Sequence, residues 1–265
     1  MIQVKAFWII AFSLCLAIIA FMNNQFVQSM IYPAPSIAVP DKPPASFTHP
    51  DWDLEIDGWL YKPQRPVRRQ VMIYFHGNGE NLETLRRSGL LDELQDLQIP
   101  FLVIDYPGYG RSKGRTSEES ILRSSTAAIA WLKKRFADHS IILCGWSLGA
   151  SVAVQTAKQT QPDALIAMST WTSLRDVAVL HFSKLVVEFA LKERYDALDA
   201  AKQIRCPVLM IHGELDDLIP SSQGEKVAAA IQAPKRWILL PVVGHNDLLS
   251  QPAVWKEIAT FLIAL

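Results

Sequence analysis

Cysteine is scarce in this chain. The 265 residues include three cysteines, Cys15, Cys144 and Cys206, and their spacing does not match that of a metal site. Cys144 ends one expected strand and Cys206 precedes another, so in a parallel sheet they lie at opposite ends and we expect no disulfide between them. The cysteines therefore indicate neither a metal centre nor an oxidising compartment.

An excess of charge is also lacking. Lys and Arg together number 26, Asp and Glu together number 26, and the formal net charge is zero. The sequence has no basic stripe and no acidic tail, so nothing in it indicates a nucleic-acid partner. It also has no internal repeat and no low-complexity tract. Half of the residues are hydrophobic, and this length suits one α/β domain with an additional segment.

One stretch near the N-terminus has no charge at all. Ala6 to Met22 is an uncharged run of 17 residues, close to the shortest length that spans a bilayer. Lys5 precedes the run and Asp41 is the next charged residue, so the positive-inside rule places the N-terminus in the cytoplasm and the rest of the chain on the exported side. We favour an uncleaved, single-pass signal anchor. The alternative is a signal peptide cut after a small residue such as Ser29.

These features predict three regions. Residues 1–29 form the signal anchor or transmembrane segment, and residues 30–48 form a spacer. The spacer includes Tyr32 to Pro44, whose five prolines exclude a helix. Residues 49–265 form the folded domain.

From residue 71 onwards, short apolar runs alternate with segments of helical period. Continuous apolar runs of this length are typical of strands that are covered on both faces, and therefore of a parallel sheet. An earlier segment, Leu54 to Tyr61, is typical of an antiparallel edge strand with a turn at Asp57-Gly58. The apolar runs are Val71–Phe75, Phe101–Ile104, Ile141–Cys144, Ala164–Met168, Val208–Ile211 and Trp237–Leu240.

Helices are expected between these strands. The last helix runs from about Ala253 to the end of the chain. Residues 171–201 are too long for a simple crossover and apolar around much of a helix, so we expect a helical cap over the carboxyl edge of the sheet. The alternative is a crossover helix that only covers the sheet. Two earlier helices carry apolar stripes, one made by Leu82, Leu85, Leu90, Leu94 and Leu97, the other by Ile121, Leu122, Ile129 and Leu132.

The chain is organised around Gly145-Trp146-Ser147-Leu148-Gly149. An apolar strand precedes this pattern and a segment of helical spacing, Ala150 to Lys158, follows it. Strand, Gly-x-Ser-x-Gly and helix together are typical of the nucleophile elbow of the α/β-hydrolase fold. The serine is lifted clear of the sheet there, and the N–H groups of the helix point at negative charge beside it.

A nucleophilic serine needs a base and a carboxylate that orients the base. In the order of the fold, these groups follow as acid and then histidine, each in a loop after a strand. Asp216 fills the acid position, with its neighbour Asp217 and the later Asp247 as alternatives, and His245 fills the histidine position. We expect two other histidines to be structural: His76 to hydrogen-bond its own loop, and His212 to be a satisfied core residue.

Five local motifs together resemble a serine hydrolase of the α/β-hydrolase superfamily, and most closely its membrane-anchored branch with an N-terminal signal anchor. The resemblance covers roughly residues 50 to 265. The motifs are His76-Gly77-Asn78-Gly79, Asp105 to Ser112, Gly145 to Gly149, His212-Gly213 through Asp216 to Ile219-Pro220, and Gly244-His245.

The resemblance implies a mostly parallel central sheet with helices on both faces and a short helical cap. It implies Ser147 as nucleophile, His245 as general base and Asp216 as the orienting acid. The oxyanion hole would use the backbone N–H groups of Leu148 and Asn78. No metal or organic cofactor is implied.

The function predicted from this resemblance is hydrolysis of carboxylic ester or thioester bonds through an acyl-enzyme intermediate. The substrate would be a small molecule or an acylated partner, and the membrane would be reached through the N-terminal anchor. A peptidase or amidase would use the same residues, so that alternative stays open. A non-catalytic binding protein usually lacks a triad residue, and a dehalogenase needs a carboxylate at position 147, so both are disfavoured.

Overall fold

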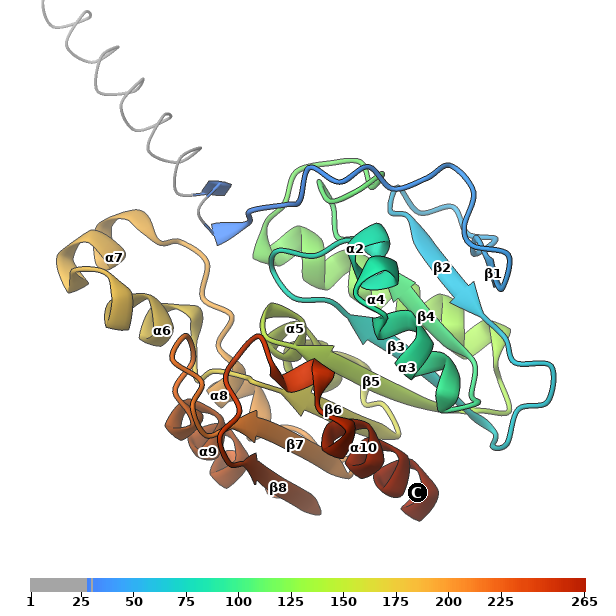
Figure 1. Cartoon of the computed structure of the whole chain (residues 1–265). Helices are drawn as coiled ribbons and strands as arrows, with labels where there is room; N and C mark the ends of the chain where they lie inside the picture. Colours follow the sequence, from blue (N-terminus) through green and yellow to red (C-terminus); the bar gives the residue numbers. More distant parts are fainter. Residues whose placement is uncertain (1–27, 30) are drawn as a thin grey trace, which may run out of the picture.

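A computed structural model describes residues 28, 29 and 31–265 of the protein (Figure 1). The uncharged run Ala6 to Met22 lies outside the described residues, so the signal anchor stays a prediction. Within the described ranges, no helix has both the length and the apolar character needed to cross a membrane.

An eight-stranded sheet forms the centre of the molecule, in the order β1-β2-β4-β3-β5-β6-β7-β8. Strands β3 to β8 run parallel to one another, while β2 is antiparallel to β4 and β1 is antiparallel to β2. The predicted mostly parallel sheet is confirmed. The strands are β1 Phe47–Thr48, β2 Gly58–Tyr61, β3 Gln70–Phe75, β4 Phe101–Ile104, β5 Ser140–Trp146, β6 Ala164–Met168, β7 Val208–Gly213 and β8 Lys235–Leu240.

Two strand predictions need correction. The antiparallel strand begins at Gly58, not at Leu54, and the predicted turn at Asp57-Gly58 is wrong, because the chain there already runs beside β4 and the Asp57 carbonyl accepts the Asp105 N–H at 3.0 Å. The last apolar run lies in β8, which is an edge strand and only partly buried. An apolar run alone does not distinguish a central strand from an edge strand.

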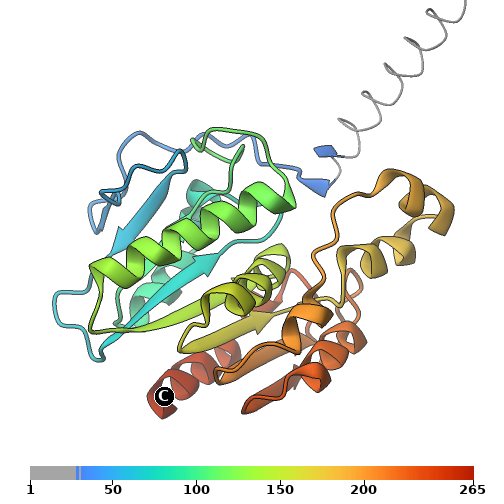
Figure 2. The same ribbon diagram turned by 180° about the vertical axis from the view of Figure 1, so that it is seen from behind.

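Helices cover both faces of the sheet, as Figures 1 and 2 show from opposite sides. One face is covered by α4 Glu118–Arg135, α5 Leu148–Thr160, α8 Ala197–Ala201 and α9 Ser221–Ala230, whose apolar residues share one core with the sheet. The other face is covered by α2 Leu82–Arg87, α3 Leu90–Asp96 and α10 Pro252–Ala264, which share a second core.

The leucine stripe predicted for one helix belongs to two. The chain breaks at Gly89, whose φ of 82° lies in the left-handed region, and Gly89 is the N-cap of α3. All five leucines nevertheless lie in the same core, because α2 and α3 cover the same face of the sheet. The periodicity therefore predicted the buried face correctly but not the break.

The cap segment after β6 forms three helices: α6 Leu174–His181, α7 Lys184–Ala190 and then α8. Figures 1 and 2 show α6 and α7 standing clear of the sheet, on the side where the described chain begins. Helix α8 instead packs in the core beside α5. The segment thus combines the predicted cap with the crossover that we weighed as its alternative.

Candidate active site

Ser147 lies at the junction of β5 and α5 in a conformation that few residues adopt. Its φ is 57° and its ψ is −119°, and its N–H donates to Met168 O at 2.9 Å. The flanking glycines permit this turn. A Cβ at Gly149 would lie 1.9 Å from Phe75 O, and one at Gly145 would lie 2.1 Å from Gly149 O. Non-glycine residues are held in such strained conformations mainly at functional sites.

The structure brings together three residues that the sequence separates widely. His245 follows β8 and Asp216 follows β7, and all three side chains are buried. His245 Nε2 lies 3.0 Å from Ser147 Oγ, and His245 Nδ1 lies 2.7 Å from Asp216 Oδ2. This order of contacts would let the imidazole take a proton from the hydroxyl while the carboxylate fixes the ring.

Asp216 is held as a carboxylate. Burial alone would raise its pKa, but hydrogen bonds from His212 and His245 and the Ile219 N–H, which donates to Oδ1 at 2.7 Å, hold the pKa well below its usual range. The alternative acids lie in different surroundings, since Asp217 and Asp247 are both exposed. The described contacts therefore single out Asp216.

His212 has a contact that the sequence did not reveal. We expected a satisfied core residue, and its Nε2 does lie 2.8 Å from Ile219 O. The same nitrogen lies 3.3 Å from Asp216 Oδ2, whereas Nδ1 is buried without a hydrogen-bond partner among the described residues. His212 thus helps to position the acid. The four-residue spacing between His212 and Asp216 is the only trace of this contact in the sequence.

The two expected oxyanion donors come from different elements. Leu148 is the first residue of α5, so its N–H has no acceptor within the helix. Asn78 lies in the loop after β3, where Tyr109 Oη donates to both its backbone oxygen and its Oδ1 at 2.9 Å. Asn78 Nδ2 donates to the carbonyl of Ile31. These contacts fix the loop that would carry the second N–H.

Further side chains fix the same loop. His76 Nδ1 lies 2.7 Å from Gly77 O, in line with the structural role expected for His76. The Gly77 N–H donates to Glu80 Oε2 at 2.7 Å, and burial raises the pKa of this carboxyl. Trp146 packs on the His245 ring with centroids 5.0 Å apart, and a Cβ at Gly77 would lie 2.5 Å from the Trp146 ring. Sequence reasoning missed both Glu80 and Trp146.

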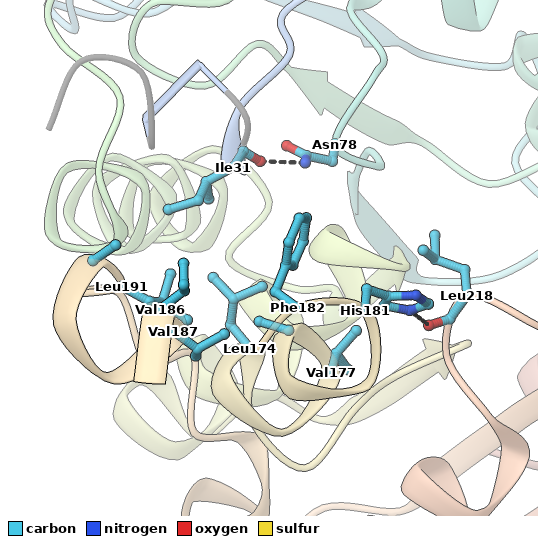
Figure 3. A pocket seen from close by; sticks show the side chains of 12 residues that line it. Ile31, Asn78, Leu174, Val177, His181, Phe182, Val186, Val187, Leu191 and Leu218 are labelled. Atoms are coloured by element: carbon cyan, nitrogen blue, oxygen red, sulfur yellow. Dashed lines mark hydrogen bonds between the residues drawn. The ribbon is translucent and has the colours of Figure 1, made fainter. Parts of the chain in front are cut away.

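An apolar groove of about 260 Å³ lies between the cap and the loop of Asn78. Figure 3 shows Ile31 and Asn78 on one side of it and cap side chains on the other. Leu218, two residues after Asp216, also lines the groove, and its carbonyl lies 3.0 Å from His181 Nε2. The cap contributes mainly hydrocarbon to the lining: Leu174, Val177, Phe182, Val186, Val187 and Leu191.

No metal site is evident in this part of the chain. Among the described residues, no group of three or more His, Cys, Asp or Glu side chains could hold a metal ion.

Comparison with known proteins places the chain in a family. Residues 70–198 match the family described as the alpha/beta hydrolase fold. Over 213 residues the chain is 33% identical to protein Rv2307c of Mycobacterium tuberculosis, which is uncharacterized, and the match covers 79% of this chain and 75% of that protein. The chain belongs to the α/β-hydrolase family. This confirms the resemblance that the five motifs indicated.

Other relatives of this α/β-hydrolase have more informative names. It is 30% identical to the lysophosphatidylserine lipase ABHD12 of Danio rerio over 189 residues, which cover 64% of this chain and 50% of that protein. It is 28% identical to protein bem46 of Schizosaccharomyces pombe, with 79% of this chain and 73% of that protein covered. The chain therefore spans about half the length of the lipase that it matches.

Among solved structures, the α/β-hydrolase resembles the esterase Pf2001 of Pyrococcus furiosus. The TM-score is 0.69 at 18% sequence identity, and the match covers 87% of this chain and 98% of that one. Est1E of Butyrivibrio proteoclasticus, solved with ferulic acid, gives a TM-score of 0.67 at 19% identity, covering 82% and 98%. At this level of identity, the likeness shows the fold alone.

Proposed function

We propose that this α/β-hydrolase is a serine hydrolase that cleaves carboxylic ester or thioester bonds through an acyl-enzyme intermediate. One observation carries the proposal: Ser147 Oγ, the His245 ring and the Asp216 carboxylate form a continuous buried series of contacts at 3.0 and 2.7 Å. A serine hydroxyl is ordinarily a weak nucleophile because it keeps its proton at neutral pH. A histidine within hydrogen-bond distance, oriented by a carboxylate, activates the hydroxyl by accepting that proton.

The proposed reaction has two halves. Ser147 Oγ attacks the acyl carbonyl as its proton passes to His245 Nε2, and Asp216 stabilises the imidazolium that forms. The backbone N–H groups of Leu148 and Asn78 hold the oxyanion. His245 then gives its proton to the leaving alcohol or thiol, which leaves the acyl group on Ser147. Water, deprotonated by the same ring, releases the acid and restores the serine.

The lining of the groove supports a substrate with an apolar acyl group. Hydrocarbon side chains of the cap face Asn78, whose N–H would hold the oxyanion. A peptide in the same groove would need partners for its backbone N–H and C=O groups, and this lining offers few. The relatives named lysophosphatidylserine lipases support the same class of bond. The groove thus favours an acyl ester over the amide alternative.

Membrane anchoring is part of the proposal. The uncharged run Ala6 to Met22, preceded by Lys5, supports a single-pass anchor with the N-terminus in the cytoplasm and the hydrolase on the exported side. A membrane partner suits an enzyme whose substrate carries an apolar chain.

Labelling with a fluorophosphonate, followed by a panel of acyl esters, acyl thioesters and amides, tests the proposal. We expect wild-type protein to be labelled and Ser147→Ala to lose both labelling and several powers of ten in turnover. Ser124→Ala is the control, because Ser124 lies in α4, where its hydroxyl donates to the Ile121 carbonyl of the same helix. Wild-type turnover by Ser147→Ala would refute the assignment.

A further inference from the structure

We propose that Ile31, in the segment that links the N-terminal run to the domain, completes the acyl groove and is a specificity-determining residue for acyl chain length. The inference rests on the proposed ester hydrolysis. Sequence alone assigned this stretch to the anchor and spacer. In the structure, Ile31 lines the groove opposite the cap (Figure 3).

The main chain of Ile31 contacts the catalytic machinery. Its carbonyl accepts a hydrogen bond from Asn78 Nδ2, while Tyr109 Oη occupies the Oδ1 atom of the same side chain. Both ends of the Asn78 amide are therefore held, one of them by the linking segment. Ile31 thus lies directly beside the loop that would hold the oxyanion.

Neighbouring residues fix the position of Ile31. The buried Tyr32 Oη lies 2.8 Å from Tyr195 Oη, at the base of the cap. Tyr195 O in turn accepts the Ser151 hydroxyl at 3.3 Å, which ties it to the nucleophile helix α5. Gln28 Nε2 donates to Glu193 Oε1 at 3.1 Å. With contacts on both sides of it, Ile31 is a fixed wall of the groove.

A fixed apolar wall limits the length and width of the chain that fits. In a hydrophobic pocket, one methylene gained or lost changes the specificity ratio by roughly 10- to 200-fold. A larger side chain at position 31 should fill space that a long acyl chain needs, and should leave a short chain unaffected. A smaller side chain should widen the groove.

The test uses full-length protein in detergent and a series of p-nitrophenyl esters from acetyl to palmitoyl. We expect Ile31→Trp to lose at least about tenfold in kcat/KM on the long esters relative to the acetyl ester. Ile31→Ala should move the preference towards longer chains. Ile37→Trp is the matched control, since the exposed Ile37 lies in the same spacer and does not line the groove.

The proposed hydrolysis and the role of Ile31 are refuted by different results. If wild-type protein hydrolyses none of the esters, the proposed function is wrong. If it hydrolyses them and Ile31→Trp keeps the wild-type chain-length profile, or loses all lengths equally, the role of Ile31 is wrong.

A second inference comes from the exposed apolar side chains of the cap. Five large apolar side chains on or between α6 and α7 are at least half exposed, up to 84% for Phe189. Clusters of this kind on a soluble surface indicate a contact with a membrane or another protein. The five residues are Leu180, Phe182, Leu185, Val186 and Phe189, and we call them the cap face.

The position of the chain's N-terminal run indicates which contact this is. Gln28 is bonded to Glu193 at the base of the cap, and it lies six positions after Met22, the end of the uncharged run. Six residues span at most about 20 Å. We infer that the cap face docks on the lipid bilayer in which the run is anchored. The exposed Lys184 lies between Phe182 and Leu185 in the sequence and the exposed Lys192 follows Phe189; exposed lysines are common in segments that lie at a membrane surface.

Docking would also give the substrate a path. Phe182 and Val186 belong both to the cap face and to the groove lining. A chain leaving the bilayer would thus meet the groove without crossing water.

The test places a single fluorophore on full-length protein in phosphatidylcholine vesicles that carry a quencher on their acyl chains. Ser183→Cys, in a Cys15→Ser background, puts the label between α6 and α7 and keeps every residue of the cap face; the two remaining cysteines are buried. Ser46→Cys is the control, because the exposed Ser46 lies beside β1, away from the cap in Figure 1.

We expect the label at position 183 to lose fluorescence and the label at 46 to keep it. Equal fluorescence at both positions in vesicle-bound protein would overturn cap docking and leave the anchor intact; another chain covering the face would give the same result. Failure of the protein to stay with the vesicles would refute both the docking and the anchor.

Discussion

Two adjacent aspartates in the loop after β7 have opposite surroundings. Asp216 is buried and lies 2.7 Å from His245 Nδ1, whereas Asp217 is exposed. We expect Asp216→Asn to lose roughly three to four powers of ten in turnover, because the amide no longer stabilises the imidazolium or its correct tautomer. Asp217→Asn should lose less than about tenfold, since a solvated charge acts only through the local field.

Steady-state kinetics of both variants on one activated ester separate the two roles. Circular dichroism of each variant controls for misfolding. Small and equal losses would place the acid elsewhere, and Asp247 would be the next residue to test.

The order of motifs along the chain predicted which residues the structure brings together. Parallel strands all end at the same edge of the sheet, so residues in the loops that follow these strands lie near one another. Ser147, Asp216 and His245 each follow a strand that is recognisable as an apolar run. The supporting contacts of Glu80 and Trp146 were not predictable in this way. Glu80 accepts an N–H from three residues earlier in the same loop, and Trp146, the last residue of β5, meets the His245 ring from the loop after β8. No periodicity or motif records either contact.

At the scale of elements, the junction of β5 and α5 depends on the absence of side chains. A Cβ at Gly149 would lie 1.9 Å from Phe75 O, so backbone atoms of β3 or α5 must move to accept it. We expect Gly149→Ala to lower the free energy of unfolding by about 1 to 3 kcal/mol, as overpacking does in other cores, and to lower turnover as well. Urea unfolding and ester kinetics measure the two effects.

Gly79→Ala is the matched control, because no atom lies within 4 Å of a Cβ at that position. Its free energy of unfolding should stay within about 0.5 kcal/mol of wild type. Wild-type stability in Gly149→Ala would mean that the helix can shift away from β3 at little cost.

Element boundaries were the least predictable part of the fold. The leucine stripe gave no sign of the break between α2 and α3, because the residues on both sides of Gly89 keep the same buried face. The cap segment was recognisable by its apolar excess, yet its division into α6, α7 and α8 depends on where the chain returns to pack beside α5. Such tertiary contacts decide boundaries that local patterns leave open.

At the scale of the whole molecule, the buried Asp216 carboxylate links folding to pH. Burial opposes its ionisation, but the bonds from His212, His245 and Ile219 N–H outweigh this and hold its pKa below that of the unfolded chain. A depressed carboxyl pKa contributes stability above the unfolded value of about 3.9, and that contribution is lost as the pH falls below it.

We therefore expect the urea midpoint of wild type to exceed that of Asp216→Asn by a margin that is larger at about pH 7 than at about pH 3. Asp217→Asn controls for the loss of an exposed carboxylate, and its margin should be small at both values. If the margin between wild type and Asp216→Asn does not change with pH, folding does not lower the pKa of the Asp216 carboxyl.

The membrane topology is a second property of the whole chain. Lys5 is the only charged side chain close to the uncharged run, and it lies on the N-terminal side. We expect a reporter fused after Leu265 to lie outside the cytoplasm and to sediment with membranes.

The structure also bears on cleavage of the N-terminal segment. Gln28 is bonded to Glu193, and cleavage after Ser29 would remove this contact. Mass spectrometry of the membrane fraction should accordingly find the chain uncleaved. A product that begins at Met30 would instead establish a cleaved signal peptide, and a soluble cytoplasmic product with its N-terminus intact would contradict the anchor. Because one lysine gives only a small bias, two or three lysines added after Met22 should place part of the reporter in the cytoplasm.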